Sequence, residues 1–136
     1  MSKGAKRKES YEAGQTLIEV VAGIGLLVIV VTALIGLGVI ALKTSSSARN
    51  RTIAVKLANE GMELVRAARD QNTWTDFVAL SWPDQDITVG STTFTRKTTV
   101  ADTSDPGKKK ITVAVEWTES SGTKSVSVTS YLTDWR

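Results

Sequence analysis

Glu19 is the residue whose position most strongly predicts chemistry. It immediately precedes an uninterrupted apolar run, residues 20–42. A charge at the centre of a membrane-spanning helix costs roughly 2.5–3.5 kcal/mol, and acids in such segments usually serve a function. At the end of the run the side chain can reach the headgroups, which lowers that cost. The position predicts an ion pair with a cation at the lipid boundary. The alternative is a carboxylate that only reaches toward the headgroups.

Catalytic chemistry is poorly supported by the composition. The chain has no His and no Cys, so it lacks the commonest general base, the commonest metal ligand and all thiol chemistry. Asp84 and Asp86 are interpreted as solvated turn acids rather than as a calcium site, and Asp102 and Asp105 likewise as turn residues. No glycine-rich phosphate loop is present. We expect no enzyme activity and no cofactor.

The basic run Lys108, Lys109 and Lys110 is the second candidate site. With Arg96 and Lys97 on a neighbouring strand, it would form a patch able to contact the phosphates of DNA. However, the net charge of +3 falls to +1 without residues 1–14, which hold four basic and two acidic side chains. Lysines at a loop edge more often protect an exposed strand from aggregation. Direct DNA binding is therefore the weaker interpretation.

The element that must position Glu19 is a membrane helix. Residues 20–42 are Ala, Val, Gly, Ile or Leu, except for Thr32. As a helix they would be about 34 Å long, against a hydrocarbon core of about 30 Å. Basic residues before the run predict a cytoplasmic N-terminus, with the C-terminal part across the membrane. The run is too long for an ordinary secretory signal. These features predict a single-pass membrane protein.

The residues around Glu19 resemble a known signal. The segment from Ala13 to Glu19, Ala-Gly-Gln-Thr-Leu-Ile-Glu, is similar to the class III signal of type IV prepilins and pseudopilins. In that family a membrane peptidase cuts after the glycine on the cytoplasmic face and methylates the new N-terminus. The resemblance implies a leader of residues 1–14, cleavage between Gly14 and Gln15, and N-methylation of Gln15, where the family usually has Phe. Residues 57–70 also resemble minor pilins.

The resemblance also implies a partner for Glu19. In an assembling filament, the amine of Gln15 in one subunit would pair with Glu19 of a neighbour. Removing one member of a buried pair costs roughly 3–5 kcal/mol, so the pair would act as a check on axial register. The implied partners are prepilin peptidase, other pilin subunits, the inner-membrane assembly platform and, before assembly, membrane lipid.

Glycines interrupt the apolar helix. Each costs about 1 kcal/mol relative to Ala in a helix interior, but small residues let neighbouring helices approach closely. Gly36 occupies the place where many major pilins carry a helix-breaking Pro, so Gly36 and Gly38 are candidates for local unwinding. The alternative is that they reflect the general frequency of glycine in membrane helices.

The globular part, residues 43–136, is expected to begin with an amphipathic continuation of the helix to about residue 70. Its apolar positions recur at helical spacing: Ile53, Leu57, Gly61, Leu64 and Ala68, flanked by Ala54, Ala58, Met62 and Val65. Lys56 with Glu60, and Glu63 with Arg66, are spaced to pair on the outer face. Residues 15–42 would form the transmembrane and assembly half of the same stem.

A connecting segment, residues 71–86, with room for a short helical turn, precedes an antiparallel sheet over residues 87–136. A hairpin is expected around Gly90 and Ser91, and a second turn at Ser121 and Gly122. Apolar residues alternate with Thr and Ser, which predicts one face packed on the helix and one face in water. Among the tryptophans, we expect Trp117 in the core, Trp74 and Trp82 at its edge, and Trp135 at a contact between subunits.

These patterns predict an α+β fold, a long N-terminal helix packed on a small antiparallel meander, which is also the pilin plan. The expected function is a structural subunit, a minor rather than a major pilin, that passes from the inner membrane to an extracellular filament. Two alternatives remain open. One is a pseudopilin of a type II secretion or competence and DNA-uptake system. The other is a signal-anchored binding domain that never polymerises.

Overall fold

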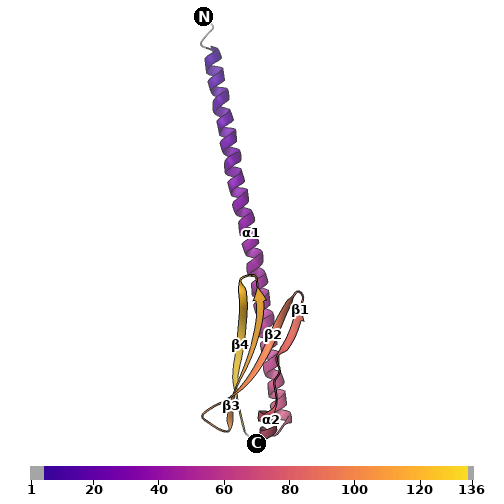
Figure 1. The fold of residues 1–136 in the computed structure, drawn as a ribbon. Coiled ribbons are helices and arrows are strands. Elements are labelled where there is room, and N and C mark those ends of the chain that lie inside the picture. Colours follow the sequence, from indigo (N-terminus) through magenta and orange to yellow (C-terminus); the bar gives the residue numbers. More distant parts are fainter. Residues whose placement is uncertain (1–4, 135–136) are drawn as a thin grey trace. The chain divides into compact units, whose positions relative to one another are not determined.

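The computed structural model describes the backbone of residues 5–134 and the side chains of residues 16–134. Helix α1 (Ala5–Gln71) is followed by the short helix α2 (Trp74–Ala79). Four strands follow, β1 (Gln85–Val89), β2 (Thr92–Asp102), β3 (Lys108–Glu119) and β4 (Gly122–Thr133). Figure 1 traces these elements along the chain. The chain divides into two compact units between Ser45 and Ser46, close to the boundary expected after residue 42.

The four strands form one antiparallel sheet in the order β1-β2-β3-β4. Two-residue loops join β1 to β2 and β3 to β4, because Val89 pairs with Thr92 and Glu119 pairs with Gly122. Gly90 opens the first loop with φ +65°, which L-residues with a side chain rarely adopt. The first hairpin is therefore confirmed. The second loop is Ser120 and Ser121, one residue earlier than expected.

The connecting segment contains the short helix α2, as its sequence allowed. Thr73 is its N-cap, and its side chain accepts a hydrogen bond of 3.2 Å from the backbone N–H of Asp76. Such a cap satisfies one of the backbone donors that a helix start leaves unpaired. Phe77 is completely buried and holds α2 against the core, where its ring centroid lies 5.8 Å from that of Trp74.

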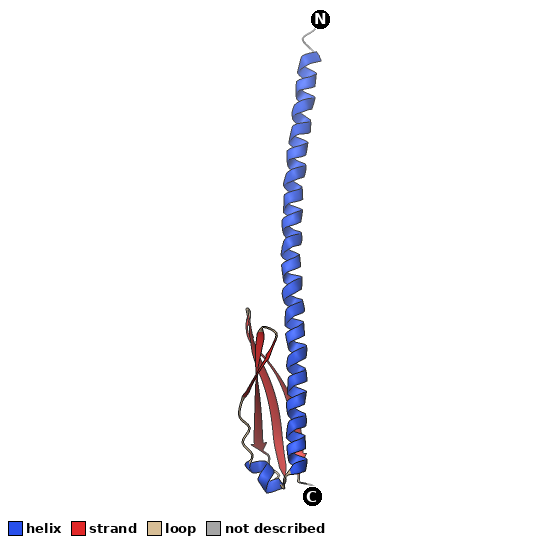
Figure 2. Ribbon diagram, turned by 90° about the vertical axis from the view of Figure 1, so that its right-hand side faces the viewer, coloured by secondary structure: helices blue, strands red, loops and turns tan. Residues whose placement is uncertain are grey.

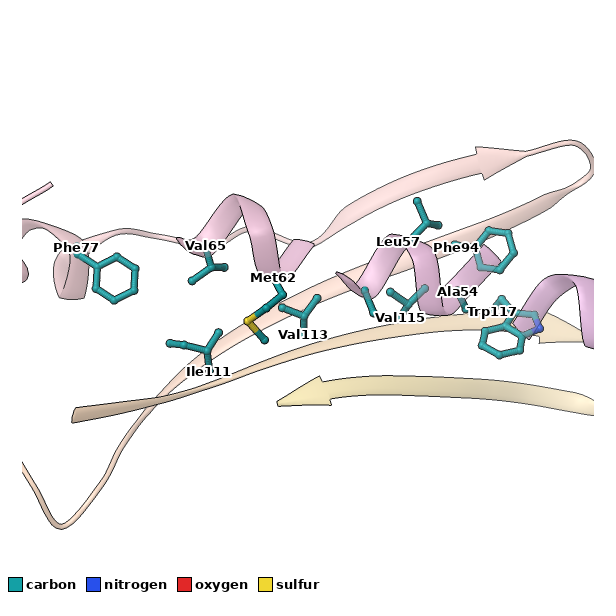
Figure 3. Close-up of a cluster of buried hydrophobic side chains, with 11 residues drawn as sticks. Ala54, Leu57, Met62, Val65, Phe77, Phe94, Ile111, Val113, Val115 and Trp117 are labelled. Carbon is teal, nitrogen blue, oxygen red and sulfur yellow. The ribbon is translucent and has the colours of Figure 1, made fainter. Parts of the chain in front are cut away.

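The hydrophobic core of the second unit lies between α1 and one face of the sheet (Figures 2 and 3). Strand β3 alternates through it, with Ile111, Val113, Val115 and Trp117 buried. The opposite face of the sheet carries hydroxyl side chains that pair across strands, such as Thr88 with Thr93 and Thr112 with Thr129. The predicted α+β fold, with a helix laid on a four-stranded meander, is confirmed.

The buried stripe of α1 differs from the expected one at one position. Ala54, Ala58, Met62 and Val65 are buried, whereas Leu64 is 49% exposed. The sheet covers a stripe centred on the i, i+4, i+7 series from Ala54, and Leu64 lies at the edge of that stripe. Sequence periodicity could not separate these two choices because apolar residues occupy both flanks. Trp117 lies in the core and Trp74 and Trp82 pack against it, as expected.

Candidate assembly surface

The apolar part of α1 is exposed along its whole length. The side chains of residues 16–42 are all exposed, among them Leu27, Ile29 and Ile35. This helix is long and apolar enough to cross a membrane, and it lies near the N-terminus. A side-chain set of this kind needs a covering of lipid or of neighbouring apolar helices, because apolar surface in water is unfavourable.

The one hydroxyl among the side chains of residues 20–42 forms a hydrogen bond within the helix. Thr32 donates from Oγ1 to the carbonyl oxygen of Val28 at 2.8 Å, and Thr44 makes the same contact to Ile40 at 3.0 Å. A polar group without a partner would cost several kcal/mol in hydrocarbon, roughly 2–7 kcal/mol. The local bond removes that penalty, so residues 20–42 present no unsatisfied side-chain donor to lipid.

Glu19 lies exposed on α1 at the start of this apolar surface. Its carboxylate is therefore accessible to a cation supplied from outside the chain. Gly14 and Gln15, the residues at the expected cleavage site and methylation site, are described only in their backbone. The site is thus defined by one described residue.

Helix α1 continues unbroken through Gly36 and Gly38. Neither glycine unwinds the helix in this structure. A Cβ atom built at either position would meet nothing within 4 Å, so the chain itself does not use the space that these glycines leave. The expected alternative role, close approach of neighbouring helices, stays a prediction about assembled subunits.

The lysine run is separated from Arg96 and Lys97, which corrects the grouping expected from the sequence. Lys109 and Lys110 pair with Asp102 and Ala101 at one end of β2, six residues from Arg96. Lys109 forms an ion pair with Asp102, and the Lys108 ammonium lies 4.8 Å from the centroid of the Tyr131 ring. Two of the three lysines therefore have partners within the chain. This weakens the case for a phosphate-binding patch.

Arg96 and Lys97 point to opposite faces of β2 because side chains alternate along a strand. Lys97 lies on the outer face, 2.8 Å from Glu116, and this hydrogen bond and charge raise the pKa of the Lys97 ammonium. Arg96 is buried. Its Nε donates to Gln85 at 3.1 Å and its Nη1 to the carbonyl oxygen of Leu57 at 3.3 Å. Arg96 therefore ties β1 and β2 to α1.

A buried Arg96 explains a glycine that faces it. A Cβ atom built at Gly61 would lie 2.8 Å from Cδ of Arg96 and 2.9 Å from Cγ1 of Val113. Real Cβ atoms essentially never approach so closely. Gly61 is thus a position where α1 packs closely on side chains of the sheet. The sequence placed Gly61 on the apolar stripe but contained no signal for the arginine beneath it.

A second buried arginine joins the last described residues to the end of α1. Arg69 has 3% of its side chain exposed and donates from Nη2 to the carbonyl oxygen of Thr133 at 3.3 Å. The same nitrogen lies 3.6 Å from Asp134, and the guanidinium carbon lies 5.2 Å from the centroid of the Trp74 ring. Sequence reasoning missed this residue, because an arginine next to Asp70 on a helix predicts a solvated side chain.

Glu119 connects the opposite end of the sheet to α1. Its Oε1 accepts hydrogen bonds from Nε1 of Trp117 at 2.8 Å and from Nδ2 of Asn50 at 3.1 Å. The bond from Trp117, followed by that from Asn50, lowers the pKa of the Glu119 carboxyl. Hydrogen bonds to a carboxylate favour its charged form. This contact links a helix residue to a strand residue.

Acidic side chains do not gather into a metal site in the part of the chain that the structure describes. Asp86 accepts a hydrogen bond from Thr95 at 2.8 Å.

No protein-family model, no curated protein and no solved structure matches the chain. The resemblance to prepilins therefore depends on the segment from Ala13 to Glu19 and on the segment 57–70.

Proposed function

We propose that this chain is a pilin-like structural subunit, a minor rather than a major pilin, of a type IV pilus-like filament. The observation that carries the proposal is an acid, Glu19, at the start of a helical segment whose apolar side chains are all exposed. Lipid can cover that segment in a precursor, and the same segments of neighbouring subunits can cover it in a filament. A structural subunit that moves between the two surroundings needs such a helix.

The proposed sequence of events begins with the precursor in the inner membrane, its N-terminus in the cytoplasm. Prepilin peptidase would cut between Gly14 and Gln15 and expose an amine four residues before Glu19. An inner-membrane assembly platform would then move the stem out of lipid and into the filament. There the amine of one subunit would meet Glu19 of its neighbour, and the loss of either charge would leave the other unpaired in an apolar surrounding.

Replacing Glu19 by Ala tests this mechanism. We expect Glu19→Ala to insert into the membrane and to be cleaved normally, yet to enter filaments at least about tenfold less, because loss of one partner of a buried pair costs roughly 3–5 kcal/mol. The measurement is the amount of the chain in sheared surface filaments relative to the membrane. Glu12→Ala is the matched control, because cleavage of the leader would remove Glu12 from the subunit before assembly. Normal incorporation of Glu19→Ala would contradict the pairing mechanism.

The signal-anchored binding domain is the alternative from a different class of protein. It shares the membrane helix but keeps its leader and stays monomeric. Mass spectrometry of the N-terminus separates the two. A chain that begins at Gln15 and occurs in the sheared fraction supports the filament subunit. A chain that keeps residues 1–14 in every fraction supports the anchor. The partners of the filament would distinguish a pilus from a secretion or competence pseudopilus.

A further inference from the structure

The face of α1 that is turned away from the sheet carries a row of charged residues between Arg49 and Glu63. The sheet covers the side that holds Ala54, Ala58, Gly61 and Val65. Arg49, Lys56, Glu60 and Glu63 are exposed. Their spacings of seven, four and three residues repeat the helical period, so they share one stripe along the helix.

This stripe is divided by charge sign. Its first part holds Arg49 and Lys56, and no Asp or Glu occurs anywhere in residues 43–59. Its second part holds Glu60 and Glu63. We call these the basic and the acidic part of the stripe. Such a division makes two copies of the helix complementary when they lie parallel and one is shifted along its axis. Without the shift, like charges face each other.

Contacts within the chain leave most of these charges available to a neighbour. Glu63 and Arg66 form an ion pair of 2.7 Å at the surface. Lys56 and Glu60 are spaced to pair, but among the described residues the structure has no ion pair between them. A lysine that precedes its glutamate by four residues is the less favourable orientation in a helix. The expected pair of Glu63 with Arg66 is thus confirmed. The expectation that Lys56 pairs with Glu60 was wrong.

We propose that the acidic part of this stripe binds the basic part of a second copy of the chain. The inference depends on the proposed function, because membrane insertion in one orientation makes neighbouring stems parallel. Arg49 precedes Glu60 by 11 residues and Glu63 by 14 residues. At 1.5 Å per residue, Arg49 of one copy lies level with Glu60 or Glu63 of the other when the two are shifted by roughly 17–21 Å. The contact joins two different parts of the stripe, so each copy can bind one neighbour through its basic part and another through its acidic part.

The contact is electrostatic and exposed to solvent, so its strength depends on the salt concentration. Salt screens such charges over a Debye length of about 8 Å at physiological ionic strength. One contact is weak, and a repeated row of contacts along many stems selects the axial shift. The pair at Glu19 would form at a shift of four residues, roughly 6 Å, so the stripe contact joins a different pair of neighbours in the same filament.

Charge reversal tests the proposal in the full-length chain in the cells that produce it. One variant combines Arg49→Glu with Lys56→Glu, a second combines Glu60→Lys with Glu63→Lys, and a third carries all four changes. We expect each double variant to enter sheared filaments about fivefold less, or worse, because like charges now face each other. The fourfold variant restores opposite signs at the same shift, so its incorporation should return to near the wild-type level.

The matched control reverses two exposed lysines away from the stripe, Lys110→Glu with Lys124→Glu. It makes the same change in net charge as the first double variant, and we expect normal incorporation. Equal amounts of each precursor in the membrane show that folding and insertion are intact. Normal incorporation of both double variants, or failure of the fourfold variant to recover, overturns this inference while a defect in Glu19→Ala keeps the proposed function. Absence of the wild-type chain from sheared filaments overturns both.

Cysteine crosslinking measures the shift directly, since the chain contains no Cys. Arg49→Cys combined with Glu60→Cys cannot close within one helix, because the two positions lie about 17 Å apart and a disulfide needs Cα atoms within about 7 Å. We expect mild oxidation of filaments to produce a ladder of linked subunits from this pair and only monomer from Arg49→Cys alone. Dimers from Arg49→Cys alone would indicate unshifted neighbours and overturn the inference.

Discussion

At the scale of single residues, Glu119 shows how one carboxylate can join two elements. It accepts hydrogen bonds from Trp117 on its own strand and from Asn50 on α1. Both bonds favour the ionised carboxylate, and together they lower its pKa. A carboxyl whose pKa is lower in the folded than in the unfolded chain stabilises the fold above its unfolded pKa. That stabilisation is lost as the pH falls through the folded pKa.

Replacing Glu119 by Gln should therefore change the acid dependence of stability. We expect the melting temperature of the wild-type chain to fall as the pH is lowered from about 5 to about 3, partly because Glu119 is protonated. Gln keeps an oxygen acceptor but cannot titrate, so Glu119→Gln should show a smaller fall. The measurement is thermal unfolding followed by tryptophan fluorescence in detergent at several pH values. Parallel curves for the two chains would show that Glu119 contributes nothing to the acid limb.

At the scale of elements, the contact between α1 and the sheet is set by a glycine above a buried arginine. Gly61 lets the two backbones approach, and Arg96 fills the space below it while bonding to Leu57 and Gln85. The arginine satisfies a carbonyl of the helix through its guanidinium and covers apolar surface with its stem. The pair therefore fixes both the distance and the axial position of the helix on the sheet.

Gly61→Val is expected to destabilise the second unit. The new side chain would enter a space where even a Cβ lies 2.8 Å from Arg96 and 2.9 Å from Val113. Overpacking of this kind costs roughly 1–3 kcal/mol. Ala67→Val is the matched control, because Ala67 is exposed on the same helix and surface changes are usually within about 0.5 kcal/mol. The measurement for both variants is the free energy of unfolding by urea. Equal values for the two variants would show that the close approach at Gly61 is not required.

At the scale of the whole molecule, the two units make different demands on their surroundings. The second unit buries its own apolar residues between α1 and the sheet. In the first unit, residues 16–42 bury nothing within the chain. The chain therefore holds a unit with its own apolar core and a helix that requires another apolar phase. This division is what a subunit stored in lipid and later packed among neighbours would need.

A charge in the middle of the apolar segment should remove the protein from the membrane. Val31→Arg places a guanidinium near the centre of residues 20–42, where it costs roughly 2.5–3.5 kcal/mol on insertion scales. We expect a lower fraction of the chain to resist extraction by alkaline carbonate. Leu42→Arg is the control, because a basic side chain at the end of the segment can reach the headgroups. Equal retention of both variants would contradict a spanning helix.

Several elements could be predicted from sequence because their signals are local. Alternation predicted the buried face of β3, from Ile111 to Trp117, and the glycine at position 90 predicted the first hairpin. The phase of the helix stripe was less certain, and Leu64 was wrongly placed in it. The grouping of Arg96 and Lys97 with the lysine run was wrong as well. Strand register and strand face decide such groupings, and a single sequence does not contain them.

The sequence by itself determined the apolar helix with Glu19 at its start, the α+β class and the lack of histidine and cysteine chemistry. These follow from composition and from periodicities that act over a few residues. Only the tertiary structure decided that Arg69 and Arg96 are buried, that Gly61 packs closely on Arg96 and Val113, and that a stripe divided by charge faces away from the sheet. Those features depend on how α1 is rotated against the sheet. That rotation results from side-chain packing between residues far apart in the chain.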